Sequence, residues 1–375
     1  MANNIKQVLN YLQANFVFTK NLGNQRVEYR KINDPKFIEL NDEAFNSIRL
    51  EISLQNIPCS RDTLSSIIFS GQWPSYDPYK TWLASLPLWD GEDHIKQLAD
   101  TVHTDDDDYF FWCLKKWLVA FVGSLAEDDV VNQTAIILCG NQGIGKSSWF
   151  AKIMPKELLE YYGMGFLQPK DKETKIMLSE LCLYNMDEVE NMKPANIEAT
   201  KELMTESHIY LRRAYTKLSK RYVRRCSFCG TANGVQILHD ITGNRRFLCQ
   251  NVDDIDEDIS HVNLEQVYAQ AYHLFRAKFQ FWFDKQGQIL VEKHNSRFRA
   301  ISIEDELITT YFEPCAINEK GAELLQAHQI MARLLSKTTG IRLSVEQVGR
   351  ILSSKGFTRK KQHGIAKWIV RERQP

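Results

Sequence analysis

Three short apolar runs in the middle of the chain predict buried strands. Residues 134–139 are apolar and rich in β-branched side chains, residues 181–188 end in two adjacent acids, and residues 225–233 end in small polar side chains. Apolar runs of this length, bounded by polar residues, are typical of parallel strands covered on both faces. Because stretches long enough for helices separate these runs, we expect an α/β fold with a parallel sheet flanked by helices.

The terminal regions have patterns of their own. Helical spacing over residues 5–14 and 42–54, with a hairpin signal around Gly23 between them, predicts a small α+β module. Near the other end, a helix over 345–354 and a basic hairpin around 363–364 predict a winged-helix-like unit. We therefore divide the chain into an α+β N-terminal module (1–75), a helical bracing segment (76–128), a core (129–262) and a helical region that ends in the winged-helix-like unit (263–375).

A glycine-rich loop follows the first strand. Residues 140–147 read Gly-Asn-Gln-Gly-Ile-Gly-Lys-Ser and fit the pattern G-x-x-x-x-G-K-[ST] without a mismatch. Between a strand and a helix, such a loop surrounds phosphate groups with backbone N–H groups, and the helix adds the positive end of its dipole. A chance glycine-rich turn is the alternative. We expect ATP to be bound by Gly140, Asn141, Gln142, Gly143, Ile144, Gly145, Lys146, Ser147 and Ser148.

Individual roles follow from the chemistry of nucleotide hydrolysis. Lys146 would reach the β- and γ-phosphates, and Ser147 would hold Mg²⁺. Asp187, the first of the adjacent acids, would bind the same Mg²⁺, while Glu188 would orient and deprotonate the attacking water. The alternative for the two acids is the start of a surface helix, where carboxylates suit the helix dipole. Asn233 is either a polar sensor of the γ-phosphate or a plain turn residue.

Two adjacent arginines follow the third strand. Arg245 and Arg246 lie behind a Gly-Asn turn in residues 240–247. Fixed positive charge in such a place suits an arginine finger that stabilises the transition state of phosphoryl transfer. A surface salt bridge to Asp240 or to the acids of 253–258 explains the arginines equally well.

Two local clusters of positive charge suit nucleic acid. Residues 209–225 contain seven basic residues, three tyrosines and no acid, a composition that suits phosphate contacts and base stacking on a single strand. A solvated basic hairpin is the alternative. The second cluster is the basic hairpin of the winged-helix-like unit, which could contact duplex DNA or another protein. The predicted contacts of the first cluster are Arg212, Arg213, Tyr215, Lys217, Lys220, Arg221 and Arg224.

The order of these motifs resembles the virulence-associated E family, P-loop ATPases of phages, plasmids and genomic islands that are similar to superfamily 3 helicases and AAA+ ATPases. The resemblance covers residues 76–265. It rests on Trp-Asp-Gly at 89–91, the glycine loop, the acid pair, Arg-Ala-Tyr at 213–215, Gly-Thr-Ala-Asn at 230–233 and Thr-Gly-Asn-Arg-Arg-Phe at 242–247. It implies a P-loop NTPase core, a hexamer-type ring, finger arginines that act on the neighbouring subunit, and replication of a mobile element. One departure is Arg-Ala-Tyr-Thr-Lys at 213–217, where the family usually has Arg-x-Pro-Tyr-x-Arg.

Composition limits the partners. The 47 basic and 47 acidic residues balance, so any attraction to DNA is local. The eight cysteines lack paired metal spacing, and with no signal sequence at the start we expect a cytoplasmic protein. Residues 117–126 are apolar over about half a membrane span and predict a core helix. We predict a DNA-dependent ATPase with ATP and Mg²⁺ as cofactors, acting as a helicase on single-stranded or forked DNA beside a separate primase. The alternative is an ATP-driven switch or loader that regulates a primase or defence effector without unwinding DNA. A P-loop kinase of small metabolites is a distant third, against which the acid pair and the arginines argue.

Overall fold

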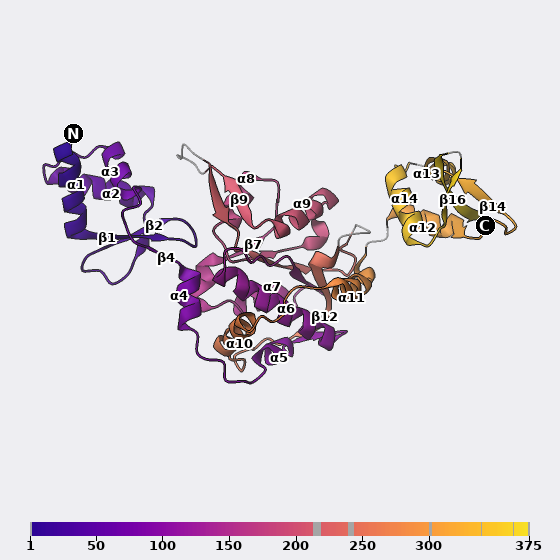
Figure 1. Cartoon of the computed structure of the whole chain (residues 1–375), viewed down its shortest axis with the longest axis horizontal. Helices are drawn as coiled ribbons and strands as arrows, with labels where there is room; N and C mark the ends of the chain where they lie inside the picture. Colours follow the sequence, from indigo (N-terminus) through magenta and orange to yellow (C-terminus); the bar gives the residue numbers. More distant parts are fainter. Residues whose placement is uncertain are drawn as a thin grey trace.

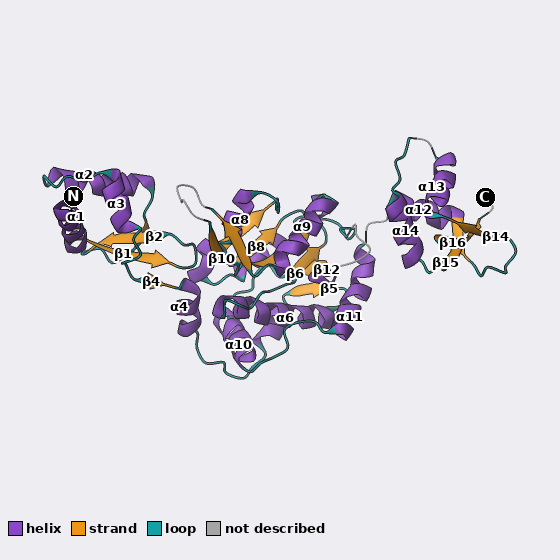
Figure 2. Cartoon of the chain, turned by 45° about the horizontal axis from the view of Figure 1, so that its top comes forward, coloured by secondary structure: helices purple, strands orange, loops and turns teal. Residues whose placement is uncertain are grey.

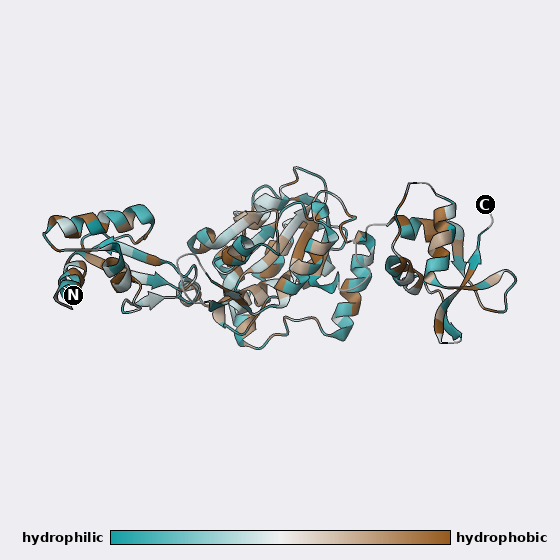
Figure 3. Ribbon diagram, turned by 90° about the horizontal axis from the view of Figure 1, so that it is seen from above, coloured by the Kyte–Doolittle hydropathy of each residue, from teal (hydrophilic) through white to brown (hydrophobic). Residues whose placement is uncertain are grey.

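The computed structural model describes residues 2–212, 219–238, 244–299, 302–338, 340–362 and 364–373. In this part of the chain the protein is a mixed α/β molecule with three lobes along its longest axis (Figures 1 and 3). The N-terminal lobe lies at one end, a larger central lobe follows, and the C-terminal lobe lies at the other end.

The N-terminal lobe packs helices against a small sheet of order β3-β2-β1-β4. Asn41 and Ser60 cap the second and third helices through their side-chain oxygens, which is why those helices begin there. Its elements are α1 (Ala2–Asn15), β1 (Phe16–Asn21), β2 (Val27–Lys31), β3 (Ile38–Glu39), α2 (Asp42–Leu54), α3 (Arg61–Ile68) and β4 (Ser75–Tyr76).

The central lobe is built on a six-stranded sheet of order β5-β12-β6-β11-β8-β7, in which all neighbours are parallel except β5 and β12. Its strands are β5 (Val102–Thr104), β6 (Ala135–Cys139), β7 (Tyr162–Gly165), β8 (Leu183–Met186), β11 (Ser227–Ala232) and β12 (Phe247–Ile255). The short antiparallel edge strand β5 was not among the predicted elements.

Helices cover both faces of this sheet (Figure 2). Alternate side chains of β6 enter two different hydrophobic clusters, Ile136 and Leu138 on one face and Ile137 on the other. The central helices are α4 (Pro78–Ser85), α5 (His94–Ala99), α6 (Asp107–Ala126), α7 (Lys146–Lys152), η1 (Lys156–Tyr161), α8 (Lys172–Leu178), η2 (Val189–Asn191), α9 (Pro194–Thr205), η3 (Asn244–Arg246), α10 (Leu264–Arg276), α11 (Lys285–Asn295) and η4 (Ser296–Phe298). A two-stranded hairpin, β9 (His208–Leu211) and β10 (Lys220–Val223), leaves the lobe between β8 and β11.

Helix α6 forms the centre of the larger hydrophobic cluster. It is the only helix of the described ranges that is long and apolar enough to cross a membrane, but 72% of its apolar window is buried inside the protein. Trp117 is 1% exposed, and its indole N–H donates to the carbonyl of Phe228 at 2.9 Å. The segment predicted as a core helix is therefore buried, as expected.

The C-terminal lobe has its own core and a small sheet of order β13-β16-β14, with β15 paired to β16. Its helix α14 and the hairpin that follows occupy the residues predicted from the sequence. The elements are α12 (Ile303–Tyr311), β13 (Phe312–Pro314), β14 (Ala322–Leu325), α13 (Ala327–Ser336), α14 (Val345–Ser354), β15 (Arg359–Gln362) and β16 (Ile365–Glu372).

Candidate nucleotide site

The carboxyl ends of three parallel strands meet at one edge of the central sheet. Cys139 of β6 pairs with Ala232 of β11, and Gly230 of β11 pairs with Met186 of β8. After β6 the chain forms β7, β8 and β11, which all lie on one side of β6 in the sheet, whereas the next strand, β12, pairs with the other side of β6. Strand β6 therefore lies at a topological switch point, where open α/β sheets bind ligands. The glycine loop, the acid pair and Asn233 all follow these strand ends.

The glycine loop turns sharply between β6 and α7. Gly143 and Gly145 both have φ of +88°, a conformation that favours glycine. A Cβ at Gly140 would stand 2.4 Å from the carbonyl oxygen of Val252, so the start of the loop has no room for a side chain. The loop therefore requires glycine at these three positions, for backbone conformation at two and for space at the first.

Lys146 lies under the loop. Its ammonium donates to the carbonyls of Gly140 at 2.8 Å and Asn141 at 2.5 Å. Burial lowers the pKa of Lys146, and the carboxylates of Glu190 and Asp187 oppose that shift. A partly desolvated cation held at a helix start is suited to an anionic ligand.

Three oxygen-bearing side chains converge beside Lys146. The Thr231 hydroxyl donates to Asp187 Oδ1 at 2.7 Å, and the Ser147 hydroxyl donates to the same oxygen at 3.4 Å. Mg²⁺ prefers oxygen ligands and is usually held by one or two carboxylates together with substrate phosphates. Ser147 and Asp187 fit this ion, and Thr231 fixes the orientation of the carboxylate.

Glu188 lies at a strained turn. Its backbone is left-handed, with φ of 51°, a conformation that costs a non-glycine residue about 1–3 kcal/mol and is often found at functional sites. Its side chain is exposed and accepts a hydrogen bond from Asn191 Nδ2 at 3.0 Å. The acid is thus free to face solvent at the mouth of the pocket.

These groups line a pocket of about 290 Å³. The structure brings together the predicted residues Gln142, Gly143, Gly145, Lys146, Ser147, Ser148, Asp187, Glu188 and Asn233, with Thr231 in addition. The loop residues Gly140, Asn141 and Ile144 form the adjoining turn.

Glu190 is a residue that the sequence argument missed. Its Oε1 accepts the backbone N–H of Asn233 at 3.0 Å, while its Oε2 is buried with no hydrogen-bond partner in the described part of the chain. The contact ties the turn after β8 to the end of β11. Its partner is a backbone group 43 residues away, so no local sequence signal marks it.

Arg245 and Arg246 lie at the opposite edge of the sheet from the glycine loop. They precede Phe247, which pairs with the first residue of β6, whereas the loop follows the last one. Four strand steps separate these ends, roughly 13 Å. The acids of 253–258 lie at or beyond the far end of β12, so the alternative that the arginines form salt bridges with these acids is wrong. Asp240, the other acid considered as a partner, lies outside the described residues.

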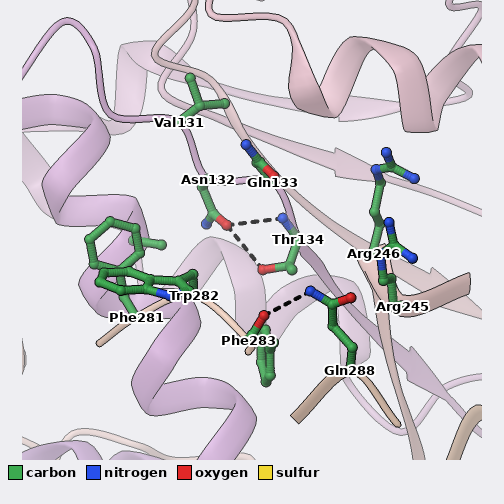
Figure 4. A pocket seen from close by; sticks show the side chains of 11 residues that line it. Val131, Asn132, Gln133, Thr134, Arg245, Arg246, Phe281, Trp282, Phe283 and Gln288 are labelled. Carbon is green, nitrogen blue, oxygen red and sulfur yellow. Dashed lines mark hydrogen bonds between the residues drawn. The ribbon is translucent and has the colours of Figure 1, made fainter. Parts of the chain in front are cut away.

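The two arginines line a second pocket, of about 230 Å³ (Figure 4). Asn132 accepts hydrogen bonds from the backbone N–H and hydroxyl of Thr134, at 3.2 and 3.1 Å, which holds the chain in front of β6. Arg245 is exposed, and both burial and the charge of Arg245 lower the pKa of Arg246. Neither arginine lies at the glycine loop of its own chain.

The predicted nucleic-acid segment divides into exposed and buried residues. Arg212, Lys220 and Arg221 are exposed, and Tyr210, which pairs with Arg221 across the β9–β10 hairpin, is 71% exposed. Arg213, Tyr215 and Lys217 lie outside the described residues.

The prediction that Arg224 contacts nucleic acid is wrong, because this side chain is buried. It is 1% exposed, and its guanidinium donates to the backbone carbonyls of Met204, Glu206 and Cys226. Burial lowers the pKa of Arg224 to about 10. It therefore holds the base of the hairpin and is not available to a phosphate backbone. Tyr222, 8% exposed, is likewise unavailable for base stacking.

The Trp-Asp-Gly motif lies away from the nucleotide pocket. The Trp89 ring packs against His273 of α10 at 4.9 Å between centroids, and the backbone N–H of Asp90 donates to Gln266 at 3.2 Å. Gly91 has φ of +98°. The motif thus fastens the connection between α4 and α5 to α10.

The fold and site define a mixed α/β protein with a glycine loop, an acid pair and polar side chains gathered at one sheet edge. The chain belongs to the family with a virulence-associated protein E-like domain, whose model matches residues 83–300. The resemblance stated from the motifs is confirmed at this level.

The protein is also similar to solved structures. The chain is similar to the apo structure of the NrS-1 C-terminal region (305–718), with 13% identity over 99% of this chain and 100% of that chain and a TM-score of 0.49. It is also similar to the A form apo structure of the NrS-1 C-terminal region, with 13% identity over 98% of each chain and a TM-score of 0.47. No curated protein matches.

Proposed function

We propose that the protein is a DNA-dependent ATPase with a P-loop NTPase core, and that it works as an oligomeric superfamily 3-like helicase in the replication of a phage, plasmid or genomic island. The observation that carries the proposal is the convergence of Lys146, the Asp187–Thr231 hydrogen bond and Glu188 on one pocket at a switch point of the sheet.

Each side chain has a distinct task in this proposal. The loop N–H groups and Lys146 bind the phosphates of ATP, and Ser147 and Asp187 hold Mg²⁺. The ion supplies neutralisation of charge on the phosphates. Glu188 orients the attacking water and accepts its proton, and Asn233 contacts the γ-phosphate.

The position of the arginines favours an assembly. Because Arg245 and Arg246 lie at the sheet edge opposite the loop, they can serve a nucleotide only in another subunit. A ring closes such head-to-tail contacts and gives every site an arginine from its neighbour. A ring also places the exposed cations of the β9–β10 hairpin, Arg212, Lys220 and Arg221, around a single strand of DNA.

The rival is an ATP-driven switch or loader that regulates a primase or defence effector. Both functions use the same ATP site, so strand displacement on a forked duplex separates them. A motor displaces the strand in the presence of ATP, whereas a switch hydrolyses ATP and displaces nothing. ATP turnover with and without single-stranded DNA tests what the two functions share.

A further inference from the structure

The C-terminal lobe has the element order of a winged helix. Helix α12, the short strand β13, strand β14, helices α13 and α14 and the hairpin β15–β16 follow one another along the chain, and all belong to the C-terminal lobe (Figure 2). Buried Ile330, Val348 and Trp368 bring the two helices and the hairpin onto one core. Such units place one helix in the major groove of DNA while a β-hairpin lies against the neighbouring backbone. We call the hairpin of residues 359–372 the wing.

Several positive charges of this lobe are paired with acids. At the base of the wing, Arg371 pairs with Glu313 at 2.5 Å and Glu319 at 3.0 Å, and Arg373 pairs with Glu313 at 3.5 Å. Lys355 pairs with Asp305 at 2.6 Å. The cations at the base are therefore neutralised within the lobe.

The outer part of the wing differs. Within the described ranges, Arg359, Lys360, Lys361 and Lys367 take part in no ion pair with a carboxylate, and all four residues of β15 are exposed. In the register of the hairpin, Lys360 lies opposite Lys367 and Lys361 lies opposite Ala366, four and five strand steps from Arg371, or roughly 13 and 17 Å from the acids that pair with it. Arg359 lies opposite Trp368, closer to the base. Their side-chain contacts are with uncharged groups: Lys367 donates to Gln362 Oε1 at 3.0 Å, and the Arg359 guanidinium lies 5.6 Å from the centre of the Trp368 ring. Concentrated positive charge that no carboxylate neutralises is the electrostatic footprint of a phosphate-binding surface.

Two of these cations repel each other across the hairpin. Lys360 stands directly across from Lys367 in the antiparallel register. Like charges in this position destabilise a strand pair. An anion bound between them would remove the repulsion, so this register is a second feature that points to an anionic ligand.

Helix α14 presents a polar face. Glu346, Arg350 and Ser353 are exposed at spacings of four and three residues, while Val348, Ile351 and Leu352 face the core. Arg350 pairs with Glu346 at 2.6 Å across one helical turn. This face carries side chains that can hydrogen-bond to base edges.

We propose that the C-terminal lobe is a second DNA site that binds duplex DNA, with α14 in the major groove and the wing cations on the phosphate backbone. This site is separate from the ATP pocket and from the β9–β10 hairpin. It would hold the duplex while the central lobe acts on the strand released from it.

The test compares two full-length triple variants. The wing variant carries Arg359→Ala, Lys360→Ala and Lys361→Ala. The control variant removes the same charge from exposed lysines of the other lobes, Lys6→Ala, Lys80→Ala and Lys156→Ala. Fluorescence anisotropy over a salt series measures binding to a labelled duplex and to a labelled single strand of the same length.

We expect the wing variant to bind duplex at least tenfold more weakly than the wild type. The slope of log K against log salt should fall by about 2.7, because three phosphate contacts are lost at about 0.9 each. Single-strand binding and DNA-stimulated ATP hydrolysis should match those of the control variant. Equal duplex binding by the two variants would overturn the proposal, as would an equal loss on duplex and single strand.

A single substitution separates a loss of DNA binding from a loss of folding. Lys360→Glu replaces the repulsion with Lys367 by an attraction, so the lobe should melt no lower than the wild type while duplex binding weakens. Unchanged duplex binding by this variant would also contradict the proposal. ATP turnover in every variant reports on the glycine loop separately, so a failure here is distinct from a failure of the proposed function.

Discussion

The Thr231–Asp187 hydrogen bond offers a sharp test of the metal site. Thr231 is 3% exposed, and its hydroxyl donates to Asp187 Oδ1 at 2.7 Å. Thr231→Val keeps the shape of the side chain and removes the donor. A hydrogen bond to a charged group contributes about 1.5–3 kcal/mol. At about 1.4 kcal/mol for each factor of ten, losing it corresponds to roughly a 10- to 150-fold effect.

The assay is ATP turnover over a Mg²⁺ titration. We expect Thr231→Val to need more Mg²⁺ for half-maximal turnover, or to turn over more slowly at saturation, by a combined factor in the range given above. Thr231→Ser keeps the hydroxyl and should stay near the wild type, which separates the hydrogen bond from packing. If Thr231→Val has the Mg²⁺ dependence and turnover of the wild type, the hydrogen bond does not position Asp187 and the argument for the metal site is wrong.

Two further predictions concern the assembly and pH. Arg245→Ala and Arg246→Ala are each mixed with Lys146→Ala, and ATP turnover of the mixture is measured. If the finger arginine acts on a neighbour, two inactive proteins should recover turnover, because an intact glycine loop then meets an intact arginine at some subunit boundaries. A mixture that stays inactive would contradict a finger in trans. Burial, together with the charge of Arg297, lowers the pKa of His294 to about 4. The unfolded chain therefore takes up this proton first, and stability present above about pH 6.5 should be lost as the pH falls toward 4. His294→Gln should melt with a weaker pH dependence than the wild type over this range, and an identical dependence would contradict the assignment.

Local chemistry made several elements predictable. Ser344 caps α14 with its hydroxyl, and Gly356, with φ of +79°, allows the chain to turn after the helix. The apolar runs became β6, β8 and β11, and because parallel strands share one edge, the loop and the two acids came together. These features depend on neighbours in sequence or on one simple rule of sheet geometry.

Other features depend on partners distant in sequence. Strand β5 has three residues, too few to show an alternation of apolar and polar positions, and it pairs with β12 about 150 residues later in the chain. Arg224 stands in a run of basic residues typical of a surface, yet its acceptors are carbonyls that only the folded chain brings together. The placement of Arg245 and Arg246 at the far edge of the sheet required the register of β12 against β6.

ATP turnover with and without single-stranded DNA tests the central claim most directly, using wild type, Lys146→Ala and Glu188→Gln. We predict hydrolysis by the wild type that rises several-fold with DNA. Both variants should lose it by about 100-fold or more, because one lacks the phosphate contact and the other the general base. Glu188→Gln should still bind ATP. Wild-type turnover by Lys146→Ala would contradict the account, since hydrolysis would then not occur at the glycine loop.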